Sequence, residues 1–117
     1  MSADLTPLES AVLDKLLDKP GEPFSTLREQ IAHAEVASRE LTGVGFFTTF
    51  SVPANAPVRR DVPSTEVTGV GAAIPQLEHG AGFVLFVRDG IASMLEGYTY
   101  GDAAWPDSVT EFSVFAT

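Results

Sequence analysis

The chain has 117 residues, with 16 Asp or Glu against 7 Lys or Arg, so its formal net charge is −9. This length fits one domain, residues 1–117, and the negative charge repels phosphate backbones and anionic headgroups, which excludes nucleic acid and acidic membranes as expected partners. The chain contains no cysteine, which excludes disulfides and thiolate metal sites and is typical of the reducing cytoplasm, where we expect the protein to act.

Two helices are expected at the beginning of the chain. The first, residues 7–18, follows the pattern of a capping box, in which Thr6 and Glu9 each accept a hydrogen bond from the other's backbone N–H. Apolar residues recur along it at helical spacing: Leu8, Val12, Leu13, Leu16 and Leu17. The second, residues 23–36, has an apolar stripe of its own, and Gln30 is expected to face water. The pair is predicted to form a hairpin that lies on a sheet.

From Val36 onward the apolar period changes from helical spacing to two, which predicts strands. Strands are expected at residues 44–52, 65–74 and 109–115, the last of them near a sheet edge. The proline-rich stretch 53–64, which includes Arg59-Arg60, is expected to be a loop. Together with the hairpin described next, these elements predict an α+β domain with two N-terminal helices packed on a mostly antiparallel sheet of about five strands.

The best-defined element is a hairpin formed by residues 82–88 and 91–97. Asp89-Gly90 between β-type runs is typical of a two-residue turn, because both of its residues need positive φ. That loop sets Arg88 opposite Ile91, and a regular ladder then places Phe83 opposite Glu96, Leu85 opposite Met94 and Val84 opposite Leu95. A longer loop is the alternative, and it would shift each of these pairs.

The strand 83–87 is apolar on both faces, which predicts a central position in the sheet. Helices would cover one face. The second face would be covered by a loop, a ligand or a second copy of the chain.

Several common catalytic patterns are missing from the sequence. The G-x-G triplets that begin at Gly43, Gly69 and Gly80 precede strands, whereas a dinucleotide fingerprint precedes a helix. His33 and His79 lack the spacing of a metal site. We therefore expect no metal and no cofactor.

The segment 96–102 is the richest in candidate binding residues. Glu96 and Tyr98 share a strand face with Tyr100, and Trp105 follows closely. Aromatic side chains beside a carboxylate are common in ligand pockets and in interface hot spots, although ordinary packing at a strand end gives the same pattern. These four residues are the predicted binding residues.

Glu96 is also the leading candidate for catalysis. A carboxylate buried on an apolar face would have a raised pKa and could act as an acid or base, with Tyr98, His79 and Arg39 as helpers; exposure at the rim is the alternative. Arg39 could pair with a carboxylate such as Glu96, or form a surface bridge with Glu40. Glu78 and His79 are expected to be a polar pair that faces a turn.

Four segments carry a resemblance to known sequences. They are Ser38-Arg39-Glu40, Thr42 to Phe47, Glu78 to Phe83 and Glu96 to Tyr100. In these segments the chain resembles a group of small uncharacterised bacterial proteins, over most of residues 36–106. The resemblance implies a bacterial, single-domain protein and no particular activity.

Two functions remain after these observations. The first is a non-enzymatic protein- or ligand-binding domain whose partner is a second copy of the chain or a basic protein. The alternative is a small hydrolase or isomerase that uses Glu96 as acid or base.

Overall fold

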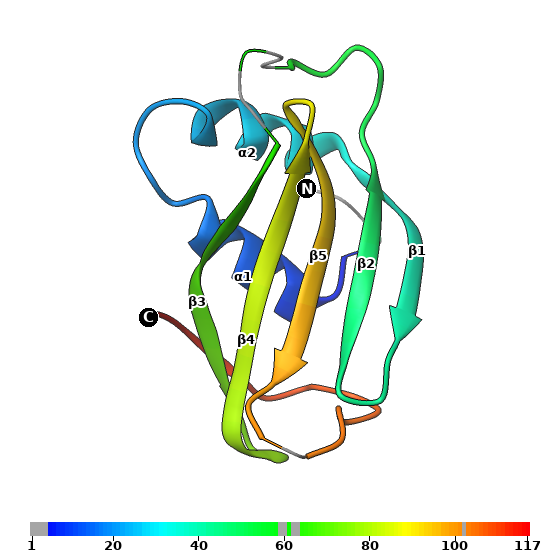
Figure 1. Ribbon diagram of the computed structural model, residues 1–117, viewed down its shortest axis with the longest axis vertical. Coiled ribbons are helices and arrows are strands. Elements are labelled where there is room, and N and C mark those ends of the chain that lie inside the picture. The colour runs from blue at the N-terminus through cyan, green and yellow to red at the C-terminus, as the bar shows by residue number, and fades with distance from the viewer. Residues whose placement is uncertain (1–4, 59–60, 62–63, 102) are drawn as a thin grey trace.

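The α+β prediction is confirmed in the computed structural model, which describes residues 5–58, 61, 64–101 and 103–117. The predicted basic pair Arg59-Arg60 and Asp102 lie outside these residues. In this described part of the chain, two helices are followed by six strands (Figure 1). In chain order they are α1 (Pro7–Leu16), α2 (Phe24–His33), β1 (Glu35–Leu41), β2 (Gly45–Ser51), β3 (Thr65–Ile74), β4 (Leu77–Arg88), β5 (Ile91–Thr99) and β6 (Ser113–Ala116).

Both helices begin close to the predicted residues. The predicted capping box opens α1: Glu9 N–H donates to Thr6 Oγ1 at 3.1 Å, and Thr6 N–H donates to Glu9 Oε1 at 2.9 Å. The second helix ends at His33 rather than at residue 36, because Ala34 is extended and strand β1 begins at once. Neither of the described helices is long and apolar enough to cross a membrane.

The six strands form one antiparallel sheet in the order β1-β2-β5-β4-β3-β6. As predicted, β4 is an interior strand and the last strand, β6, lies at an edge. Strand β1, at the other edge, is the one that the sequence prediction missed. Its residues are mostly exposed and therefore lack the apolar alternation that marks a strand.

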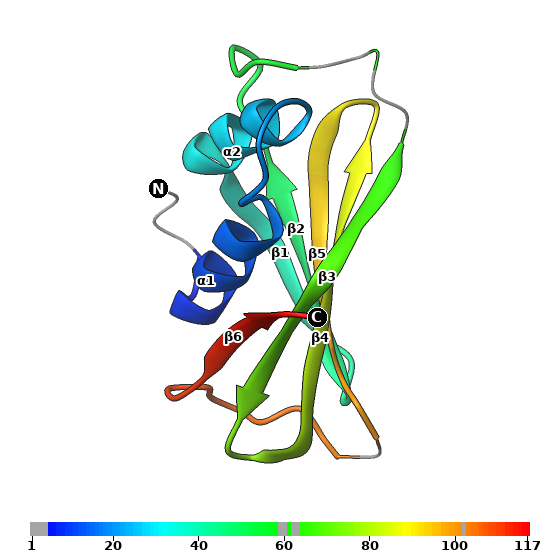
Figure 2. The ribbon, with the colours of Figure 1, turned by 90° about the vertical axis from the view of Figure 1, so that its left-hand side faces the viewer.

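Figure 2 shows that both helices lie on the same side of the sheet. Their apolar stripes pack there against side chains from β2, β3, β4 and β5, which form the core with them. Gln30 is part of this interior and does not face water: it is fully buried, donates to the carbonyls of Pro57 and Gly90, and accepts from Ala92 N–H. The prediction for Gln30 is therefore wrong.

The β4–β5 hairpin has the predicted two-residue loop but not the predicted register. Arg88 pairs with Ile91, and Asp89 has the expected positive φ of 53°. A bulge at Ser93 then inserts one extra residue into β5, so every later pair is displaced by one position. Glu96 pairs with Val84 and not with Phe83. Phe83 pairs instead with Gly97, and Leu85 pairs with Leu95 in place of Met94.

Candidate functional site

The face of the sheet opposite the helices is the first candidate surface, and we call it the open face. Successive side chains of a strand point to opposite faces of the sheet, so the neighbours of core residues along each strand point to the open face. Phe47 and Thr49, for example, alternate with the buried residues Phe46, Thr48 and Phe50 of β2. The half-buried side chains of the open face are Phe47, Thr49, Val84, Phe86, Met94, Glu96 and Tyr98.

A single row of directly paired residues crosses the middle of the open face. Glu40 of β1 pairs with Phe47 of β2, and Phe47 pairs in turn with Glu96 of β5. Val84 of β4 completes the row beyond Glu96. Side chains paired in this way lie about 5 Å apart at Cβ, so two carboxylates flank one phenyl ring.

The surface beside this row is hollowed. A cavity of about 300 Å³ is lined by Ser38, Glu40, Phe47, Thr49 and Met94. Its lining therefore combines an aromatic ring, a thioether, two hydroxyls and a carboxylate. This combination suits a long side chain with an apolar stem and a positively charged end.

Tyr98 and Tyr100 lie together at one end of the open face. Their rings meet edge to face with centroids 5.5 Å apart, and Tyr100 is 43% exposed. Burial raises the pKa of the Tyr98 phenol, and the hydrogen bond with Tyr100 and the nearby charge of Glu96 act in the same direction. Both hydroxyls lie over Gly82, where a Cβ would stand only 2.5 Å from Tyr100 Oη. The structure thus brings together Glu96, Tyr98 and Tyr100.

The remaining predicted residues lie elsewhere. His79 is exposed near the start of β4, with its Nε2 atom 4.0 Å from Glu78 Oε2, so this pair lies in the strand just after the turn at Pro75-Gln76. Arg39 pairs with Thr48 of β2, which is a core position, so its side chain points to the helix side of the sheet, away from Glu96. The prediction that Arg39 pairs with Glu96 is therefore wrong.

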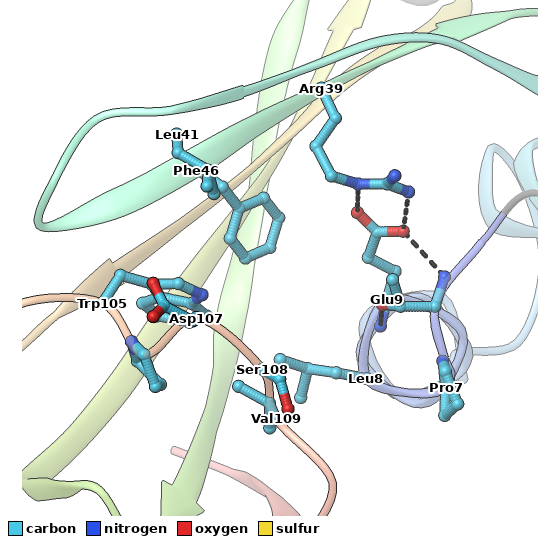
Figure 3. A pocket seen from close by; sticks show the side chains of 12 residues that line it. Pro7, Leu8, Glu9, Arg39, Leu41, Phe46, Trp105, Asp107, Ser108 and Val109 are labelled. Carbon is cyan, nitrogen blue, oxygen red and sulfur yellow. Dashed lines mark hydrogen bonds and ion pairs between the residues drawn. The ribbon is translucent and has the colours of Figure 1, made fainter.

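Arg39 and Trp105 line a cavity of about 330 Å³ on the helix side, which we call the Glu9 pocket (Figure 3). Helix α1 contributes Leu8 and Glu9, strands β1 and β2 contribute Arg39, Leu41 and Phe46, and the segment 105–109 closes the remaining side. The Trp105 and Phe46 rings meet edge to face, with centroids 5.1 Å apart. The backbone N–H of Trp105 donates to Gly43 O at 2.8 Å. Trp105 is therefore separated by the sheet from the two tyrosines.

Glu9 is a buried charged residue in the lining of this pocket. Its side chain is 2% exposed and receives the Arg39 guanidinium from Nε at 3.0 Å and from Nη2 at 2.7 Å. Thr48 Oγ1 donates to the same carboxylate from β2. Burial alone would raise the pKa of Glu9, but the hydrogen bonds from Arg39, Thr48 and Thr6 outweigh it and lower the pKa. The carboxylate thus stays charged and joins α1 to β1 and β2.

The sequence prediction used Glu9 only as a capping residue and missed this second role. The available signal is its position, because Val12, Leu13 and Leu16 follow it by three, four and seven residues. Glu9 therefore lies on the apolar stripe of α1. A carboxylate on such a stripe needs a buried partner, and Arg39 supplies it.

Neither surface contains a recognisable catalytic or metal centre. Within residues 5–58, 61, 64–101 and 103–117, no three His, Asp or Glu side chains are grouped so that they could hold a metal ion. Comparisons of the chain with protein families, curated proteins and solved structures found no match. Inference about function therefore rests on the geometry of the two surfaces.

Proposed function

We propose that this protein is a non-enzymatic binding domain whose open face binds a basic protein. The observation that carries the proposal is the row in which Glu40 and Glu96 flank Phe47 on the sheet face that no described helix covers. A lysine or arginine of the partner would lay its apolar stem on Phe47 and Met94. Its charged end would meet the two carboxylates.

The apolar side chains of the open face support a binding role. Phe47, Val84, Phe86 and Met94 are neighbours on three adjacent strands. An aromatic and aliphatic patch with carboxylates at its side resembles the core and rim of a protein interface. The same patch explains why β4 is apolar on both faces.

The charge favours a basic partner over a second copy of the chain. Each copy carries a formal net charge of −9, so two copies repel each other as they approach. A face-to-face dimer would also bring the Glu40 and Glu96 carboxylates of both copies into one interface. Arg88, four residues beyond Val84 on β4, lies over Phe86 with its guanidinium carbon 5.9 Å from the ring centroid, so it is not a member of the row that holds Glu40 and Glu96.

Catalysis by Glu96 is the weaker alternative. Tyr98 is the next residue on the same face, but the other two proposed helpers lie elsewhere. His79 is near the start of β4, and the side chain of Arg39 is on the helix side of the sheet. With Tyr98 as the one proposed helper beside it, the half-buried Glu96 carboxylate is better suited to binding a cation.

The test is a titration of the ¹⁵N-labelled domain with the peptide Arg-Leu-Arg-Leu-Arg-Leu, followed by NMR. We expect shift changes on β1, β2 and β5, with affinity that weakens as salt is added. The double variant Glu40→Gln/Glu96→Gln should bind about tenfold more weakly, because two rim contacts of about 0.7 kcal/mol each are lost.

The matched control is Asp14→Asn/Glu29→Gln, which removes two exposed carboxylates of α1 and α2, on the other side of the sheet from the open face, and changes the net charge equally. It should bind the peptide as the wild type does. Equal weakening by both double variants would mean that only the overall charge matters, and the proposed site would be rejected. Light scattering of the free protein should give a monomer, whereas a dimer at micromolar concentration would identify a second copy as the occupant.

A further inference from the structure

We infer that the Glu9 pocket is a second binding site, for a small organic cation with an apolar body such as an arylalkyl ammonium ion. This site lies on the helix side of the sheet. Binding at this site can therefore be tested independently of binding at the open face.

The size and the walls of the cavity suit a small ligand. Its volume of about 330 Å³ is at the lower end of the range for ligand pockets. Figure 3 shows Phe46 pointing into the space between Trp105 on one side and the Glu9–Arg39 pair on the other, with Leu8 and Val109 along the base. Most of this lining is apolar or aromatic, so it would bury the hydrocarbon part of a ligand.

The apolar lining of the pocket includes one largely exposed side chain. Leu41, which lines the cavity, is 66% exposed, and Val44 at the tip of the same hairpin is 52% exposed. These are the two highest exposures among the large apolar side chains of the described chain. Apolar surface that leads into an apolar cavity favours entry of a hydrophobic group.

The net charge of the lining determines whether the pocket favours a cation or an anion. Arg39 and Glu9 neutralise each other through two hydrogen bonds, so neither attracts an ion strongly. Asp107 is the third charged residue of the lining; it is exposed and has no hydrogen-bond or ion-pair partner among the described residues. The lining therefore has a net charge of −1, and the whole chain carries −9. An ammonium group would pair with Asp107 beside the rings of Trp105 and Phe46, which also attract cations.

The probe is 2-phenylethylamine, compared with 2-phenylethanol and 3-phenylpropionate, which share its phenyl body and differ in charge. Trp105 is the only tryptophan of the chain and lines the cavity, so its fluorescence reports on this site. We expect saturable changes with a dissociation constant on the order of 1 mM for the amine. The alcohol should bind at least about fivefold more weakly, and the carboxylate should not bind.

Two variants locate the contact. Asp107→Asn should weaken binding of the amine about fivefold and leave binding of the alcohol unchanged, because it removes one exposed charge and keeps the shape of the side chain. Asp14→Asn, an exposed carboxylate of α1 outside the lining, should change neither. The inference is overturned if the amine causes no saturable change, if amine and alcohol bind equally, or if Asp14→Asn weakens the amine as much as Asp107→Asn. Each of these results can be obtained whether or not the open face binds a basic peptide.

Discussion

The substitution Glu9→Gln tests how much the Glu9–Arg39 ion pair contributes to the stability of the fold. Glutamine keeps the shape of the side chain and removes the charge, so Arg39 loses its buried counter-ion while packing is retained. The carboxylate receives hydrogen bonds from Arg39, Thr48 and Thr6, and glutamine offers one acceptor oxygen where glutamate offers two. The variant is therefore expected to fold with lower stability.

The size of the loss follows from the burial of the two partners. Breaking a buried ion pair costs about 3–5 kcal/mol. The Glu9 side chain is 2% exposed but that of Arg39 is 34% exposed, so its guanidinium can regain water. We therefore expect the free energy of unfolding to fall by roughly 2–3 kcal/mol. For a domain of this size the melting temperature should fall by about 8–12 °C.

The pH dependence gives the sharper measurement. The pKa of Glu9 is lowered in the folded state, so its contribution is fully present above the ordinary value of 4.5 and is lost as the pH falls through the lowered folded value. Urea unfolding of both proteins from pH 7 to pH 2.5 should show a difference that is largest at neutral pH and shrinks in acid. Other carboxylates titrate in both proteins and cancel in this difference.

The control is Glu29→Gln, an exposed residue of α2, which should change the stability by less than about 0.5 kcal/mol at every pH. Two results would contradict the assigned role of the Glu9 carboxylate. One is a Glu9→Gln variant as stable as the wild type at pH 7, and the other is a stability difference that stays constant into acid.

Two further substitutions test contacts elsewhere in the fold. Gln30→Ala should lower the free energy of unfolding by about 2–3 kcal/mol in urea, because it leaves the buried Ala92 N–H and the buried Gly90 carbonyl without partners and removes the hydrogen bond to the Pro57 carbonyl; an effect no larger than that of Glu29→Ala would contradict this assignment. Gly82→Ala should cost about 1–3 kcal/mol and shift the NMR signals of the tyrosine rings, because its methyl group would displace the hydroxyls of Tyr98 and Tyr100; unshifted signals would mean that the tyrosines do not lie over β4.

The comparison of sequence and structure separates local signals from distant ones. Asp89-Gly90 predicted its turn correctly, because positive φ is a property of those residues themselves. The bulge at Ser93 has no comparable local signal, since packing of β4 and β5 against the core decides where an extra residue is accommodated. One inserted residue was enough to exchange the predicted partner of Glu96, and the same limit applies to any register counted from a turn.

The candidate site divides in the same way. The closeness of Glu96, Tyr98 and Tyr100 could be predicted, because alternation along one strand brings them to one face. The Glu9–Arg39 pair joins residues 30 positions apart, and only the fold brings them together. Trp105 was predicted to bind together with the tyrosines, but the segment after β5 carries it behind the sheet, to Phe46 and Phe83.

Strand β1 connects the two proposed sites while keeping their functions separate. Arg39 and Glu40 are neighbours in the chain, and the alternation of a strand sends the first to the Glu9 pocket and the second to the open face. The backbone ladder with β2 holds Glu40 opposite Phe47 whether or not Arg39 keeps its counter-ion. Loss of the Glu9 charge should therefore lower stability while leaving the row of Glu40, Phe47 and Glu96 in place below the melting temperature. The acidic residues of this chain thus differ in role: the buried Glu9 joins the helix layer to the sheet, whereas we propose that exposed carboxylates bind cations on the outer surfaces.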